Sequence, residues 1–151
     1  VTVSLDTNWD PSGSWDMGLQ EVLPLVDLFL PNAQEAMAVS GMDSLDAALQ
    51  WILERVPAIG LKQGKEGATL LTAEGRWHAP PVDVPVVDAV GAGDSFDAGL
   101  VAGMLYGLSW EESLQLGCLC GSMNTRKAGG IAGQIRKHDI RTLQSPERVS
   151  C

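Results

Sequence analysis

The residues best suited to chemistry lie in one short segment, Gly91-Ala92-Gly93-Asp94. Glycines let a backbone approach an anion closely, and the unpaired amides and positive dipole end of a helix N-terminus stabilise negative charge. A carboxylate beside such amides can take a proton from a hydroxyl group while that hydroxyl attacks a phosphoryl group. The spacing therefore predicts a general base, Asp94, next to an anion-binding turn.

The same four residues have a simpler interpretation, in which Asp94 caps the following helix and the glycines form the turn before it. The pattern is not the dinucleotide-binding fingerprint G-x-G-x-x-G, because Ser95 and Phe96 follow Asp94. The chain also contains no G-x-x-x-x-G-K-[ST] phosphate loop. The pattern alone leaves both the capping and the catalytic interpretation open.

Two other polar segments follow apolar runs. Asn32 and Glu35 have the spacing of a helix capping box, in which the two side chains satisfy each other's backbone amides. The segment 62–67, Lys-Gln-Gly-Lys-Glu-Gly, follows a buried run and is typical of a tight turn.

The elements that must position these residues alternate between strands and helices. Strands are expected over residues 1–5, 28–30 and 58–61, with a hairpin over 68–72 and 76–78. Helices are expected over 15–26 with Ser14 as N-cap, from Asn32 to Gly41, from Ser44, from about Asp94 to Tyr106 and from Ser109 to about Asn124. This alternation predicts an α/β sandwich whose sheet is partly parallel.

Composition bounds the class of protein. With 151 residues, 45% of them hydrophobic, the chain is expected to form one domain over 1–151. Its net charge of −9 disfavours nucleic-acid binding, and no run reaches the about 20 apolar residues that a membrane span needs. Cys118, Cys120 and Cys151 lack the spacing of a zinc site, so reduced thiols in the cytoplasm are expected. His78 and His138 are expected at the surface.

Several motifs together resemble one family. The segment Asp88 to Gly99 resembles D-[TA]-x-G-A-G-D-x-F, the C-terminal signature of the ribokinase-like carbohydrate kinases, also called the phosphofructokinase B family. Other pieces follow in family order: Asp6-Thr7-Asn8 resembles a D-x-N opening, the Asn32–Glu35 segment resembles N-x-x-E, and Lys62–Gly67 resembles [TK]-x-G-x-x-G. The resemblance covers nearly the whole chain.

The resemblance implies a ribokinase-like three-layer α/β/α sandwich that transfers the γ-phosphoryl group of ATP to a hydroxyl of a small-molecule sugar. Asp94 would be the general base, and the amides of Gly91, Ala92 and Gly93 would hold the charge on the transferred group. Glu35 would help hold Mg²⁺, and Asp88 would contribute to a monovalent cation site. Residues of the nucleotide site would be Asn32, Lys62, Gly64, Gly67 and Asp88. A cytoplasmic location and a homo-oligomer are compatible with this family.

The sequence also departs from the family pattern. It has no counterpart of the N-terminal substrate-binding half, with its glycine-pair motif and β-sheet lid, so we expect the C-terminal, nucleotide-binding part of a kinase. In the late helix, Gly117 stands where many members have an asparagine near adenine. Two alternatives stay open: a nucleotide-binding module without catalytic activity, and a nucleoside kinase of the same fold.

Overall fold

A five-stranded mixed sheet forms the centre of the computed structural model, which describes residues 1–8, 10–15 and 18–136. The strands, in spatial as well as chain order, are β1 (Ser4–Leu5), β2 (Leu28–Phe29), β3 (Ala58–Lys62), β4 (Ala68–Thr72) and β5 (Gly75–Ala79). Strands β1, β2 and β3 pair in parallel, whereas β3, β4 and β5 pair antiparallel. The prediction of a partly parallel α/β sheet is therefore confirmed.

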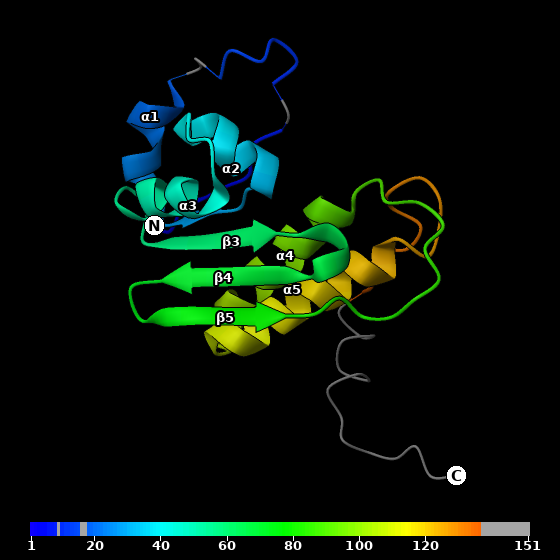
Figure 1. Cartoon of the computed structure of the whole chain (residues 1–151). Helices are drawn as coiled ribbons and strands as arrows, with labels where there is room; N and C mark the ends of the chain where they lie inside the picture. Colours follow the sequence, from blue (N-terminus) through cyan, green and yellow to red (C-terminus); the bar gives the residue numbers. More distant parts are fainter. Residues whose placement is uncertain (9, 16–17, 137–151) are drawn as a thin grey trace, which may run out of the picture.

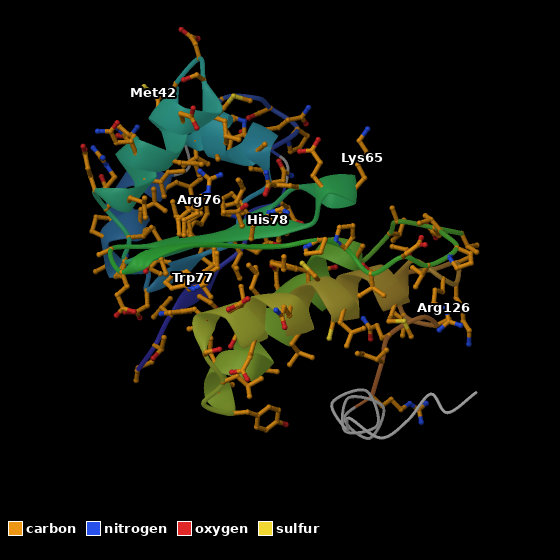
Figure 2. The ribbon with its side chains drawn as sticks, turned by 60° about the horizontal axis from the view of Figure 1, so that its bottom comes forward. Met42, Lys65, Arg76, Trp77, His78 and Arg126 are labelled. Carbon is orange, nitrogen blue, oxygen red and sulfur yellow. The ribbon has the colours of Figure 1, made fainter. Side chains whose placement is uncertain are left out.

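Helices cover both faces of this sheet (Figures 1 and 2). One layer contains α1 (Leu19–Val22), the 3-10 turn η1 (Leu23–Leu25), α2 (Ala33–Ser40) and α3 (Leu45–Leu53), and the other contains α4 (Ala92–Leu105) and α5 (Trp110–Asn124). A second 3-10 turn, η2 (Gly64–Glu66), connects β3 to β4. The three-layer α/β/α arrangement agrees with the expected fold.

Each face of the sheet has its own apolar core, and alternate strand residues divide between them. Phe29 and Ile59 pack with α2 and α3, whereas their neighbours Leu28 and Ala58 pack with α4 and α5. Successive side chains of a strand point to opposite faces, so a sheet covered on both sides needs apolar residues without alternation. This requirement explains the short continuous apolar runs in the sequence.

The helix expected over residues 15–26 is wrong in length and start. Its helical part is only α1 followed by η1, and the N-cap is Gly18, with a φ of 71°. Ser14, the expected N-cap, instead lies 2.9 Å from the Ser12 hydroxyl. Both belong to a turn around Asp10, whose carboxylate accepts hydrogen bonds from the Ser12 hydroxyl and from the Trp15 and Ser12 amides, and these bonds lower its pKa. Such local side-chain bonds compete with helix formation, and Pro24 has no amide to continue a regular helix.

The structure also bears on the expectations for the cysteines, the histidines and membrane-spanning segments. Cys118 and Cys120 are free and buried, and burial raises the pKa of each thiol to about 11. His78 is exposed, whereas His138 and Cys151 lie outside the described residues. In the part of the chain that the structure describes, no helix has the length and apolar character needed to cross a membrane.

Helices α4 and α5 pack closely because glycines replace larger side chains at their contact. A Cβ on Gly99 would lie 2.8 Å from both Leu116 O and Cys120 Sγ, and a Cβ on Gly103 would lie 2.8 Å from Ser113 Cα. Gly117, which stands where many family members have an asparagine, is buried against the ring of Phe96. These contacts leave no room for a methyl group.

We predict that Gly99→Ala destabilises the chain by about 1–3 kcal/mol through overpacking. The change should be destabilising even though alanine favours a helix interior over glycine by about 1 kcal/mol. Urea unfolding measures the effect, with Ala98→Gln at the neighbouring exposed position as the control, expected within about 0.5 kcal/mol of wild type. A Gly99→Ala variant more stable than wild type would contradict the close packing.

Candidate active site

The carboxyl ends of the three parallel strands bring polar residues to one edge of the sheet. Asp6 directly follows β1, Asn32 follows β2 and forms an isolated parallel bridge with Lys62, and Lys62 ends β3. The loops after β3 and β5 and the end of α5 lie at the same side of the molecule (Figure 1). Open α/β sheets usually bind ligands at this edge, so it is the candidate site.

The start of α4 offers unpaired amides and an unpaired carboxylate. Its N-cap is Gly91, with a φ of 72° and no side-chain cap, while Asp94 lies inside the first turn. The Ala92 amide donates to Ala89 O at 3.2 Å, but the amides of Gly91, Gly93 and Asp94 have no partner among the described residues. Asp94 is exposed. The capping interpretation of Asp94 is therefore wrong. The turn that was predicted to bind an anion has free amides at Gly91 and Gly93, whereas the Ala92 amide already donates to Ala89 O.

The loop that leads into α4 is tied to the chain that follows α5. Asp88 accepts hydrogen bonds from the Val90 amide at 3.0 Å and the Gly129 amide at 2.9 Å. Both bonds lower the pKa of Asp88, and the bond from Gly129 has the larger effect. A Cβ on Gly91 would lie 2.7 Å from Gly130 O. The side chain of Asp88 thus holds the loop in place, and only a glycine fits at position 91.

Asn124 is a residue of this region that the sequence did not reveal. It is fully buried, and its Nδ2 donates to Val90 O at 2.8 Å. Its Oδ1 has no partner among the residues that the structure describes. Asn124 is one of several polar residues in the late helix, and its partner lies 34 positions earlier, so the sequence carries no signal of this role.

Asn32 and Glu35 form the expected capping box at the start of α2. The Glu35 amide donates to Asn32 Oδ1 at 2.9 Å, and the Asn32 amide donates to Glu35 Oε2 at 2.7 Å. Burial raises the pKa of Glu35, against the hydrogen bond from Asn32 and the charge of Lys62. The box fixes the direction of the Glu35 carboxylate toward the carboxyl edge.

The carboxylates of this edge fit Mg²⁺ only when the phosphates of a nucleotide supply some of its other ligands. Among residues 1–8, 10–15 and 18–136, no group of three or more His, Cys, Asp or Glu side chains could hold a metal ion. Mg²⁺ commonly binds through one or two carboxylates, several waters and the phosphates of a nucleotide. A single oriented carboxylate such as Glu35 meets this requirement.

Lys62 forms the centre of an ion cluster at the same edge. Its Nζ lies 2.7 Å from Asp6 Oδ1 and 3.1 Å from Asp97 Oδ2. Burial acts to lower the pKa of Lys62, but the hydrogen bond to Asp6 and the charge of Asp97 raise it. Burial also raises the pKa of Asp97 to about 7, against the charge of Lys62. Sequence reasoning missed Asp97, although it lies one helical turn after Asp94.

The turn after β3 owes its shape to two glycines. The Gln63 amide donates to Gly67 O at 2.9 Å, and Gly64 and Gly67 have φ values of 58° and 85°. Gly64 is open, whereas a Cβ on Gly67 would overlap Ala79 O. Lys65 is exposed and projects outward from this turn (Figure 2). The geometry explains both glycines as turn residues beside the site, whether or not a nucleotide binds there.

A comparison with protein families identifies one match, and it covers most of the chain. The profile described as pfkB family carbohydrate kinase matches residues 1–137. The 2-dehydro-3-deoxygluconokinase of Bacillus subtilis is 29% identical over 156 residues, which cover 98% of this chain and 48% of the relative. The chain therefore spans about half the length of the curated relatives that it matches first.

Solved structures give the same picture. An E. coli protein assigned as a ribokinase II, in complex with ATP and Mg²⁺, matches with a TM-score of 0.85 and 28% identity, over 93% of this chain and 47% of that one. The nucleoside kinase of Methanocaldococcus jannaschii matches with a TM-score of 0.81 and 25% identity, again over 93% of this chain and 47% of that one. The fold is thus shared with ribokinase-like enzymes.

We predict that Asp97 makes the stability of the chain fall as the pH rises. The pKa of Asp97 is raised from 3.8 to about 7, so the folded chain binds this proton more tightly than the unfolded chain. Its contribution is therefore lost progressively between about pH 4 and pH 7. Replacing Asp97 with asparagine removes this dependence. The stability of the variant relative to wild type should therefore increase as the pH rises from about 5 to about 8.

Urea unfolding at both pH values measures this difference. Asp46→Asn, an exposed aspartate in the first turn of α3, is the matched control and should show no such gain. A stability difference between Asp97→Asn and wild type that is the same at both pH values would contradict the raised pKa.

Proposed function

Since the chain belongs to the pfkB family of carbohydrate kinases, we propose that it provides the nucleotide-binding and catalytic-base side of an ATP-dependent sugar kinase. The observation that carries this proposal is the start of α4. There, the exposed and unpartnered Asp94 adjoins the free amides of Gly91 and Gly93 at the carboxyl edge of the sheet. A base and an anion-binding turn side by side are what phosphoryl transfer to a hydroxyl group requires.

In the proposed reaction, Asp94 takes the proton of a sugar hydroxyl as its oxygen attacks the γ-phosphorus of ATP. A bond forms between the sugar oxygen and phosphorus, the bond from phosphorus to the β–γ bridging oxygen breaks, and ADP leaves. The free amides at the start of α4 donate hydrogen bonds to the oxygens of the transferred group, where negative charge must be stabilised. The positive end of the α4 dipole acts in the same direction.

Glu35 is the residue that we expect to hold Mg²⁺, with Asn32 beside the phosphates. When bound, Mg²⁺ neutralises phosphate charge, and the capping box keeps the Glu35 carboxylate in a fixed direction for it. We place the nucleotide along the turn that carries Gly64 and Gly67, and a monovalent cation near Asp88. The complex of the E. coli relative with ATP and Mg²⁺ supports the nucleotide and the metal. Free, buried thiols agree with a cytoplasmic location.

Two other functions remain candidates. The similarity to the Methanocaldococcus jannaschii nucleoside kinase favours a nucleoside as acceptor. The free amides at the start of α4 would also serve a nucleotide-binding module without catalytic activity. A panel of sugars and nucleosides with radiolabelled ATP separates these possibilities, because only a kinase transfers label and only the accepted class of substrate receives it.

We predict that Asp94→Asn lowers turnover by about 10²–10⁴-fold, the usual contribution of a general base. Binding of ATP should change little, because Asp94 acts on the acceptor hydroxyl. Steady-state kinetics and calorimetric titration with ATP measure the two effects. Asp46→Asn is the control, an exposed first-turn aspartate far from this edge. If Asp94→Asn retained near-native turnover, the assignment of the base would be wrong.

We also predict that Mg-ATP raises the melting temperature of the 151-residue chain. A ligand that binds only the folded state stabilises it by about 2.7 kcal/mol at 100 times its Kd. Circular dichroism during heating, with and without Mg-ATP, detects the shift. Glu35→Gln should reduce the shift with Mg-ATP more than the shift with ATP and excess chelator. No shift in wild type would exclude a formed nucleotide site in this chain.

A further inference from the structure

Helix α4 contacts strand β3 at two points, one apolar and one charged. Gly60 and Lys62 are two residues apart on β3, so their positions face the same side of the sheet. A Cβ on Gly60 would lie 2.9 Å from Leu100 Cδ2, and Lys62 Nζ lies 3.1 Å from Asp97 Oδ2. Asp97 and Leu100 are three residues apart and share one face of α4. The charged contact is the one nearer to the catalytic end of the helix.

The first turn of α4 is packed against α5 on one side, since a Cβ on Gly121 would lie 3.0 Å from Ala92 O, whereas toward the sheet it adjoins Lys62. Its N-cap is a glycine, and no side chain caps its free amides. Leu100 lies about two turns further along the helix. Lys62, by contrast, adjoins the first turn directly, because a Cβ on Gly93 would lie 3.8 Å from Lys62 Nζ. Through its second carboxylate partner, Asp6, Lys62 also connects α4 to the end of β1.

Lys62 is poorly suited to be a free cation for a phosphate. Two carboxylates already contact its ammonium group, and its side chain is only 15% exposed. Nor does stability alone explain the arrangement. Asp97 Oδ1 is buried without a partner among the described residues, and buried ion pairs rarely stabilise a fold more than apolar residues of the same size. A role in placing the helix explains why charges lie here.

We propose that Lys62 and Asp97 are positioning residues for phosphoryl transfer, because their contact fixes the first turn of α4, and with it Asp94, relative to β1 and β3. This inference rests on the proposed function, since it concerns the placement of the proposed base. A displacement of about 1 Å at a reacting group can cost about 100-fold in rate. The pair therefore acts on turnover through Asp94 and not on the binding of nucleotide.

A double-mutant cycle tests the proposal. Wild type, Lys62→Met, Asp97→Leu and the double variant are compared at about pH 8, above the pKa of about 7 of Asp97, where the pair is ionised. We expect each single variant to lower kcat by about 100-fold with the KM for ATP within about threefold of wild type. The double variant should lose no more than the worse single variant, because the two residues act as one unit. Asp46→Asn again serves as the control.

Three outcomes would overturn the proposal. The first is a rise in the KM for ATP in Lys62→Met with kcat unchanged, which would make Lys62 a nucleotide ligand. The second is a multiplication of the two single effects in the double variant, which would make the residues independent. The third is wild-type kcat in a folded double variant. If a single variant fails to fold because one charge is left buried, the double variant still gives this result, since it leaves only Asp6 of the cluster, whose side chain is 29% exposed.

Hydrogen exchange separates this inference from the proposed function, because it needs no catalysis. The Ser95 amide donates to Gly91 O at 3.0 Å in the first turn of α4. We expect exchange at Ser95 and the next residues to become about tenfold faster in Asp97→Leu, without ligand, than in Asp46→Asn. Unchanged exchange there would overturn the positioning role. If exchange is faster in Asp97→Leu but the wild type transfers no phosphoryl group, the kinase proposal is rejected, whereas the role of the Lys62–Asp97 contact in fixing α4 is retained.

Discussion

The parallel pairing of β1, β2 and β3 is the constraint on which the rest of the site depends. Parallel strands end at the same edge of a sheet, so this pairing gathers residues that lie far apart in the chain, Asp6, Asn32 and Lys62. The register between β2 and β3 continues past the strands, where the Lys62 amide donates to Pro31 O at 2.9 Å. This backbone bond places the start of α2, and therefore Glu35, next to the Lys62 cluster.

The opposite wall of the site depends on close packing between two helices. Glycines at the contact let α4 approach α5, and the end of α5 then holds the loop before α4 through Asn124 and Val90. Asp88 and Gly129 reinforce this loop from outside. These side chains hold the loop without contacting the amides of Gly91 and Gly93, which stay free for the anion that we propose.

The charge around Lys62 is mainly negative. Among the described residues, Lys62 is the single cation of this ion cluster, and it is already paired. Asp6 and Asp97 contact Lys62, and Glu35 and Asp94 lie nearby on α2 and α4. Such an edge receives a polyphosphate best together with a divalent cation, which changes the sign of the local charge. Next to Asp94, the positive contributions are the free backbone amides and the dipole at the start of α4.

The sequence by itself determined the features that depend on neighbouring residues. It specified the capping box at Asn32, the helix start at Ser109, the glycine turn before Asp94 and the alternation of strands and helices. It failed over residues 15–26, where local bonds to Asp10 compete with a helix. Only the tertiary structure decided the contacts of Lys62 with Asp6 and Asp97, across 56 and 35 residues, and of Asn124 with Val90. Capping and turns arise from interactions a few residues apart, whereas these contacts exist only after strand pairing and helix packing have closed long loops.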